Sequence, residues 1–522
     1  MLKRVDTLMN IPTSRTTINA VAAALMLSAA LLPAPPTRAQ EQLPQPPPAT
    51  PAVAPPADRA AFQRGLDAYK AGDLAGATRE MEVAVQAKPD DAEAYSWLGF
   101  LLVRQNDAER SVPALEKAVA LQQAMPVAGT YINLGNAYVL QKQNARAIDA
   151  FKRATQLNAN SGEAHANLGL AYLRDQRYAD TESALRQAIA LTPDRAAQAP
   201  LYGSLAFALQ KLGRAQEAAA AYNTSVEIAP TDAATFASLG ALQLERGNLP
   251  AAIKALEKAG SLDPKQYAVL INLGRAYAKS SRNIEAAEAF GGAADLQPDQ
   301  ATPRYNQGVV LATAGRFDEA AGAYQKALAL QPNYFDALIN LGFVYFRLNR
   351  PGDAATQFRA AAQAAQNTSQ RSLAYGNLGA ALTRAKDAGG AAEAFRQAAA
   401  LDPSDYESRA LLADYLLSQN KVDEALRYYK EAAALRPRSA EAQNVLGLAY
   451  RRKADYAAAG AAFRRAIAFD PRYAPAHNNL GVVFERRGQL DEAILHYKKA
   501  LALNPKLVDA RNNLARFKQT KG

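Results

Sequence analysis

Asparagine side chains recur in this chain two residues before a regularly spaced glycine. An amide group carries both a hydrogen-bond donor and an acceptor, so it can pair twice with the backbone of an extended peptide. Each pairing contributes only about 0.5–1.5 kcal/mol net, so several amides must act together. The pattern predicts a peptide-binding row, and the alternative is that the amides bond only within or between helices. The row contains Asn133, Asn167, Asn272, Asn306, Asn340, Asn377 and Asn479, and Asn513 continues it.

A second row of basic side chains stands five residues after the same glycine position. Such a row can attract acidic ligands through long-range electrostatics, and the alternative is a solvated edge. Its members are Arg174, Lys211, Lys279, Arg347, Arg384, Arg452 and Arg486. Tyr305, Phe343 and Phe346 are candidate anchors for a partner's side chains. The alternative for these three aromatic residues is that they shield neighbouring helices.

No catalytic or metal-binding pattern emerges from the sequence. The chain has three histidines (His165, His477 and His496) and no cysteine, and the histidines are expected to be units apart. A metal site requires converging ligands, so His165 and His477 are interpreted as packing residues. There is no phosphate-binding loop, nucleophile elbow or dinucleotide fingerprint. The sequence therefore predicts a non-enzymatic protein without a cofactor.

A repeat of about 34 residues positions both rows. The recurring small residue is separated from the next by 34 residues at most steps and by 36 or 37 at three of them. A constant period in this range predicts a solenoid in which each unit packs only on its neighbours. The positions are Gly65, Gly99, Gly135, Gly169, Ala206, Gly240, Gly274, Gly308, Gly342, Gly379, Ala413, Gly447 and Gly481.

Each unit is expected to contain two helices joined by a short turn. The recurring glycine lets the helix axes approach, and a large apolar residue sixteen positions later, often aromatic, fills the space beside it. A glycine in left-handed conformation is expected after the first helix at five turns. At the three irregular junctions, near residues 125–126, 195–198 and 368–371, the extra residues are expected to lengthen the preceding helix.

These features resemble the tetratricopeptide repeat (TPR) family. The resemblance implies an all-α, right-handed superhelical solenoid of about thirteen helical hairpins plus a C-terminal capping helix. It also implies that the first helices line a concave groove into which the asparagine position points. The asparagine ladder resembles that of the superhelical arm of O-linked N-acetylglucosamine transferase. The expected repeats are 58–91, 92–125, 128–161, 162–195, 199–232, 233–266, 267–300, 301–334, 335–368, 372–405, 406–439, 440–473 and 474–507, within an array spanning 58–507, followed by a cap at 508–518.

The segment before the repeats is typical of an exported protein. Residues 1–39 combine a basic start, a short apolar stretch and a small-x-small site before Gln40, as in a signal peptide. The alternative is an uncleaved membrane anchor, but the apolar stretch is shorter than the roughly 20 residues that span a bilayer. Residues 40–57 are rich in proline and alanine and are interpreted as a linker. Four basic and one acidic residue fall within the first 39, so the formal net charge of +11 becomes +8 after cleavage. The chain has no basic run with interleaved aromatic residues, the pattern that would indicate nucleic-acid binding.

The expected function is a scaffold, exported to the periplasm or secreted, that binds extended segments of other proteins in its groove. No integral membrane span is expected in the mature chain. The alternative is a component of a polysaccharide export, pilus or secretion assembly complex that contacts sugar or synthase subunits. Aromatic platforms in the groove would favour sugar, whereas an asparagine ladder favours peptide.

Overall fold

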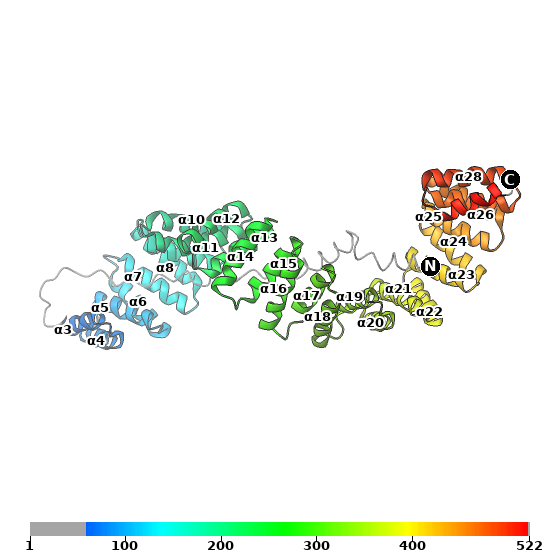
Figure 1. Cartoon of the computed structure of the whole chain (residues 1–522). Helices are drawn as coiled ribbons and strands as arrows, with labels where there is room; N and C mark the ends of the chain where they lie inside the picture. Colours follow the sequence, from blue (N-terminus) through cyan, green and yellow to red (C-terminus); the bar gives the residue numbers. More distant parts are fainter. Residues whose placement is uncertain (1–58, 520–522) are drawn as a thin grey trace. The chain divides into compact units, whose positions relative to one another are not determined.

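The computed structural model describes residues 59–519, and all regular secondary structure in that range is helical. It contains 27 helices over those residues, α3 to α29. In chain order they form thirteen helix pairs followed by α29 (Val508–Gln519), as Figure 1 shows. The expected all-α solenoid of helix pairs is confirmed. The predicted signal peptide and linker lie outside the described residues.

The helices fall into two compact units, residues 59–282 and 283–519. In the N-terminal unit the first helices of the pairs are α3 (Ala60–Lys70), α5 (Ala92–Arg104), α7 (Ala128–Leu140), α9 (Gly162–Arg174), α11 (Arg195–Lys211), α13 (Ala233–Glu245) and α15 (Tyr267–Lys279). The second helices there are α4 (Leu74–Ala87), α6 (Ala108–Leu121), α8 (Asn144–Leu157), α10 (Tyr178–Leu191), α12 (Ala215–Ile228) and α14 (Leu249–Leu262).

The C-terminal unit continues the same alternation. Its second helices are α16 (Asn283–Leu296), α18 (Phe317–Leu330), α20 (Pro351–Ala364), α22 (Ala388–Leu401), α24 (Val422–Leu435), α26 (Tyr456–Phe469) and α28 (Leu490–Leu503). Its first helices are α17 (Ala301–Thr313), α19 (Phe335–Arg347), α21 (Thr368–Arg384), α23 (Tyr406–Ser418), α25 (Ala440–Arg452) and α27 (Ala474–Arg486).

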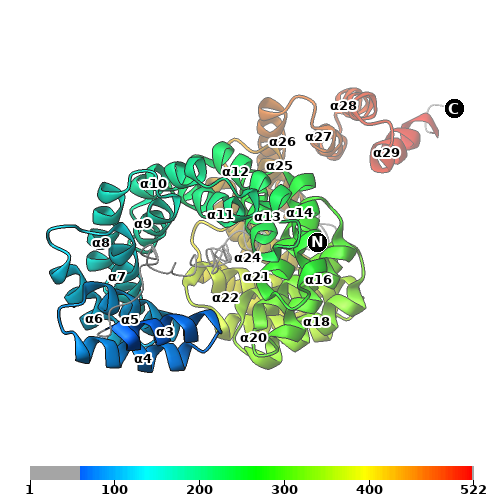
Figure 2. The same cartoon turned by 90° about the vertical axis from the view of Figure 1, so that its left-hand side faces the viewer.

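Within the N-terminal unit the two helices of each pair lie in different layers. Figure 2 shows α7, α9, α11 and α13 on the inner side of an arc and their partners α8, α10, α12 and α14 on the outer side. Neighbouring first helices contact one another, as α5 contacts α7 and α7 contacts α9. The first helices therefore present one continuous concave face.

The recurring glycine marks the place where the two helices of a pair approach most closely. A Cβ atom added at Gly135 would lie 2.4 Å from Cε1 of Phe151, sixteen residues later. The Phe151 ring is buried against the glycine backbone. Close packing of this kind leaves no room for an extra methyl group, which explains why the glycine and the large residue recur together.

The turns inside the pairs require a left-handed residue at one position. The predicted glycines, Gly72, Gly213, Gly247, Gly315 and Gly488, all have φ between 75° and 84°. Eight further turns place a residue with a side chain in the same region: Asn106, Lys142, Gln176, Ser281, Asn349, Lys386, Asn420 and Ala454. The left-handed conformation is thus a requirement of the fold, and glycine satisfies it with the least strain.

Changing Ala454 to glycine is expected to raise the free energy of unfolding by about 0.5–1 kcal/mol. Ala454 has a φ of 65°, where the Cβ of an ordinary residue meets the following carbonyl oxygen. Asn349→Gly is the control and should gain less, because asparagine tolerates a left-handed φ of 57° better than alanine does. Hydrogen exchange in α25 and α26, compared with α19 and α20, measures both changes. Equal gains at the two turns would contradict the prediction.

The sequence suggested that the extra residues at the irregular junctions lengthen the preceding helix. At two of these junctions that prediction is wrong. The extra residues there lengthen the following first helix instead: α11 and α21 have 17 residues, whereas most first helices have 13. The reason is the position of the N-cap, since the Asp194 side chain accepts a hydrogen bond from the Ala196 amide and Asn367 accepts one from Gln370. A side chain that caps a helix fixes where it begins.

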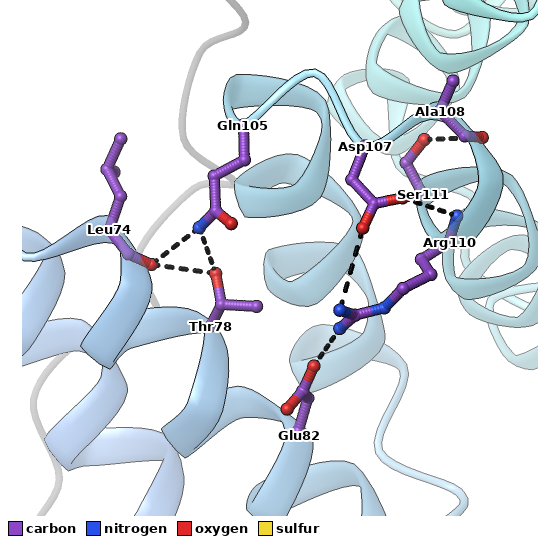
Figure 3. A network of polar contacts seen from close by, with 8 residues as sticks. All are labelled: Leu74, Thr78, Glu82, Gln105, Asp107, Ala108, Arg110 and Ser111. Carbon is purple, nitrogen blue, oxygen red and sulfur yellow. Dashed lines mark hydrogen bonds and ion pairs between the residues drawn. The ribbon is translucent and has the colours of Figure 1, made fainter.

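Polar contacts join successive pairs away from the buried interface. Gln105 Nε2 donates to the Leu74 carbonyl oxygen at 2.9 Å and to Thr78 Oγ1 at 2.7 Å, and Arg110 pairs with Glu82, as Figure 3 shows. Exposed ion pairs of this type contribute only about 0–1 kcal/mol. The buried apolar interface therefore supplies most of the cohesion between neighbouring pairs.

Candidate ligand-binding surface

The asparagine row is buried to a greater extent than the sequence suggested. Asn133 is 1% exposed and Asn167 is 4% exposed. Asn340 alone among the seven is partly exposed. The row is thus not an open ladder of amides, because neighbouring first helices pack over it. The buried members are Asn133, Asn167, Asn272, Asn306, Asn377 and Asn479.

Some of these amides bond to the preceding unit through a recurring contact. Asn479 Nδ2 donates to Asn444 Oδ1 at 2.9 Å, and Asn340 Nδ2 donates to Tyr305 Oη at 3.2 Å. Asn513 Nδ2 donates in the same way to Asn478 Oδ1 at 3.0 Å. In each case the acceptor stands three residues before the small residue of the preceding unit, 35 positions earlier. These amides join first helices to one another.

Other amides lack that partner because the acceptor position holds a side chain that cannot accept. Ile132 precedes Asn167 by 35 residues and Ile339 precedes Asn377 by 38, since the chain has three extra residues there. Nδ2 of both asparagines is buried with no hydrogen-bond partner among the described residues. A buried unsatisfied amide costs about 1–3 kcal/mol, so it requires an explanation in a native fold.

Asn133 belongs to the same group for a different reason. Its acceptor position holds Ser96, whose hydroxyl is already within 2.9 Å of Thr130 Oγ1. Both Nδ2 and Oδ1 of Asn133 are buried without a partner in the described part of the chain. The seven asparagines therefore do not form one functional set. Asn133, Asn167 and Asn377 have unused hydrogen-bonding capacity, whereas Asn340 and Asn479 are engaged.

The predicted basic row is exposed at all four sites proposed as contacts: Arg174, Lys279, Arg347 and Arg384. The Arg347 guanidinium lies 4.9 Å from the centre of the Phe317 ring, and Arg384 lies 4.7 Å from that of Phe346. Such cation–π contacts contribute about 0.5–1 kcal/mol at exposed sites. They hold the charged groups close to the array while leaving them accessible to solvent.

Two of the three predicted aromatic anchors are packing residues. Tyr305 and Phe346 are buried, and the Tyr305 ring lies 4.8 Å from that of Tyr334. Burial raises the pKa of Tyr305 well above its ordinary value. Phe343 is partly exposed but packs edge-on against Phe358 at 5.4 Å. Because Tyr305 and Phe346 are buried, neither ring can stack against a ligand ring.

The histidine arrangement differs from the expectation in one respect. His477 and His496 belong to one helix pair, and their Nδ1 atoms lie 3.2 Å apart. Burial and the neighbouring His477 lower the pKa of His496 to about 4. In the described residues no group of three or more histidine, cysteine or acidic side chains is placed to hold a metal ion.

Glu163 is a candidate that the row patterns did not reveal. It lies in the first turn of α9, and its Oε1 atom is buried without a hydrogen-bond partner among the described residues. Burial raises the pKa of Glu163 from 4.5 to about 7. The sequence contained an indirect signal for Glu163. Arg59 pairs with Glu93 of the next unit. Gly129 occupies the same repeat position as Arg59 in the unit before Glu163, so the corresponding arginine is absent there.

Comparisons with known proteins identify repeats along most of the chain. Profiles of the tetratricopeptide repeat match residues 62–126, 199–232, 237–301, 339–406, 411–474 and 474–507, and a profile described as TPR repeat matches 135–176 and 313–349. No curated protein sequence matches at a significant level. Within the described range no helix is both long enough and apolar enough to cross a membrane.

Solved structures with similar folds are distant in sequence. The chain is similar to the "Crystal structure of APC/C hetero-tetramer Cut9-Hcn1", with 15% identity over 89% of this chain and 96% of that one and a TM-score of 0.34. It is also similar to the "Structure of Naa15/Naa10 bound to HypK-THB", with 15% identity over 88% and 79% of the two chains and a TM-score of 0.33.

Proposed function

Because this chain belongs to the tetratricopeptide repeat family, we propose that it is a non-enzymatic scaffold that binds extended segments of other proteins. The binding surface is the concave face of the first helices in the N-terminal unit. The unpartnered amides of Asn133 and Asn167, both in that unit, carry the proposal. An extended backbone supplies both the donor and the acceptor that these amides lack.

Binding requires the amides to turn from their buried positions. The terminal torsion of an asparagine side chain has a broad, shallow preference, so re-aiming the amide nitrogen and oxygen costs little, whereas access from the concave face requires the side chains packed over Asn133 and Asn167 to move. The buried state is unfavourable because the amides are unsatisfied there. A bound peptide backbone would therefore relieve a penalty that the free protein carries.

The proposed location is the cell envelope, in the periplasm or outside the cell, and its support is the signal-like sequence of residues 1–39. A role in pilus, secretion or polysaccharide export assembly is compatible with a peptide-binding scaffold. Recognition of sugar by aromatic platforms has less support, because Tyr305 and Phe346 are buried.

The test compares two sets of alanine substitutions. The variant Asn133→Ala plus Asn167→Ala removes the unpartnered amides of the N-terminal unit, and we expect it to capture at least tenfold less partner protein from an envelope extract. The three unpartnered atoms, Nδ2 and Oδ1 of Asn133 and Nδ2 of Asn167, each account for a lost hydrogen bond of about 0.5–1.5 kcal/mol, which supports a change of this size. Quantitative mass spectrometry of the captured proteins gives the measurement.

The double variant Asn340→Ala and Asn479→Ala is the matched control. It removes amides that bond to Tyr305 and Asn444, so it should lower the stability of the C-terminal unit but retain the partners at a temperature where it is folded. The Asn133→Ala plus Asn167→Ala variant should be at least as stable as the wild type, because it removes unsatisfied groups. Unchanged capture by that variant would refute peptide binding by these amides.

A further inference from the structure

Glu163 is a carboxyl group for which residues 59–519 supply no compensating charge. Its Oε1 atom is buried and unpartnered among the described residues, and burial is the cause of its raised pKa. A buried carboxylate normally has a cation or several hydrogen-bond donors beside it. This carboxyl group therefore needs a partner from outside the array when it is ionised.

The same register position one junction earlier in the array shows what such a partner looks like. Glu93 stands six residues before Gly99, as Glu163 does before Gly169. Arg59 Nη2 donates to Glu93 Oε2 at 2.8 Å, and Arg59 Nε lies 3.3 Å from Asp91 Oδ2. Arg59 itself stands six residues before Gly65. A cation in the preceding unit thus satisfies the acid at this position.

At the junction that holds Glu163 this cation is missing. Gly129 occupies the position equivalent to Arg59, and a Cβ atom added there would meet no atom within 4 Å. Pro200, at the equivalent position of the following unit, has no charge either. There is therefore room for a side chain to start at Gly129, the position from which Arg59 starts at the first junction.

Two of the unpartnered amides, Asn133 and Asn167, lie in the same region of the N-terminal unit as Glu163. Glu163 and Asn167 are four residues apart on α9, so they share one face of the helix. Asn133 is on α7, which contacts α9. All three side chains have unsatisfied polar atoms. Glu163 offers a carboxylate oxygen, Asn167 an amide donor, and Asn133 both an amide donor and an amide acceptor. Together they complement a peptide backbone that carries a positive side chain.

We propose that Glu163 receives an arginine or lysine side chain of the bound segment, in the space left open at Gly129. The inference rests on the proposed function, because the segment's backbone would be held by Asn133 and Asn167. The occupant is a cationic side chain rather than a metal ion, since Glu163 belongs to no group of three or more acidic, histidine or cysteine side chains placed to hold a metal in the described residues.

The first test uses defined peptides and the full-length protein. The probe is acetyl-Thr-Ser-Thr-Arg-Thr-Ser-Thr-amide, and its counterpart carries citrulline, which has the shape of arginine without the charge. We expect the arginine peptide to bind at least tenfold more tightly at pH 8, because a hydrogen bond between two charged groups is stronger than one to the neutral citrulline. Because the mature chain is itself basic, non-specific attraction would not produce this preference.

The preference should disappear in Glu163→Gln and persist in Glu109→Gln, which removes an equal charge from the exposed face of α6. It should also decrease at pH 5.5, where Glu163 is protonated in the free protein. Ligand-observed NMR measures both affinities. One outcome would overturn the cation subsite alone: the wild type binds the two peptides equally, and the Asn133→Ala plus Asn167→Ala variant binds both more weakly. Absence of binding by both peptides would contradict the proposed peptide-binding surface as well.

The second test supplies the missing cation from within the chain. Gly129→Arg should pair with Glu163 as Arg59 pairs with Glu93, and it should abolish the preference for the arginine peptide. Gly129→Gln is the matched control for helix propensity and side-chain size. If Gly129→Arg leaves the arginine preference of the wild type intact, the assignment of Glu163 as the cation acceptor is wrong, whether or not peptides bind elsewhere.

Discussion

Replacing Gly342 by alanine is expected to lower the free energy of unfolding of its helix pair by about 1–3 kcal/mol. The added Cβ atom would lie 2.5 Å from Cε1 of Phe358 and 2.8 Å from two further ring atoms. Phe358 is fully buried, so its ring can yield only by displacing neighbours in a close-packed interior. The penalty exceeds the benefit of about 1 kcal/mol that alanine normally brings to a helix.

Gly322→Ala is the matched control in the same unit. Gly322 lies inside α18, and a Cβ atom added there meets nothing within 4 Å. The same substitution should therefore stabilise this helix by about 0.5–1 kcal/mol. Because units of a solenoid unfold in part independently, hydrogen exchange in α19–α20 and in α18 should be compared with the wild type. Stabilisation by both substitutions would show that Phe358 adapts, and would contradict the close-approach explanation.

The fold was largely predictable because the same packing problem is solved in each unit. Gly135 and Phe151 are only sixteen residues apart, so one unit contains both sides of the contact. The left-handed turn residues are also local, which is why Gly72 and Gly315 could be assigned. The direction in which extra residues lengthen a helix was not predictable from the period. It depends on a particular N-cap, Asp194 or Asn367, and a period count does not identify it.

The candidate site was predictable only in part, because its contacts cross from one unit to the next. The period located the asparagines but not their partners, since Asn479 depends on Asn444, 35 residues earlier. Asn167 lacks a partner because Ile132 occupies the corresponding place. Glu163 was harder still to find, because its signal is a missing side chain at Gly129. A comparison of register positions in successive units would have exposed both cases.

The distinction between engaged and unpartnered amides also changes what the period means for function. A recurring residue need not have one role, because the side chain at the acceptor position of the preceding unit determines whether the amide forms a hydrogen bond within the fold. Asn340 is used by the fold through Tyr305. Asn133 is not, since its amide is buried without a partner in the described residues and the Ser96 hydroxyl lies against Thr130 instead. On the function proposed above, departures from regularity in the acceptor position, rather than the asparagines themselves, mark the candidate ligand-binding positions.

Glu163→Gln is expected to stabilise the free protein at pH 8 and to have almost no effect at pH 4. Burial raises the pKa of Glu163 from 4.5 in the unfolded chain to about 7 in the folded one. Between these values the folded state binds more protons than the unfolded state, so the free energy of unfolding falls as the pH rises. Above pH 7 the full cost of the buried charge is present, about 1–3 kcal/mol after allowance for partial solvation.

The measurement is hydrogen exchange in α7–α10 of the ligand-free protein at the two pH values. Glu93→Gln is the control, because it removes an acid that is already paired with Arg59 and should not stabilise the fold at pH 8. If Glu163→Gln stabilised the protein equally at pH 4 and pH 8, its effect would come from packing rather than charge. If it destabilised the protein at pH 8, Glu163 would have a cationic partner within the chain, and the site would not need one from a ligand.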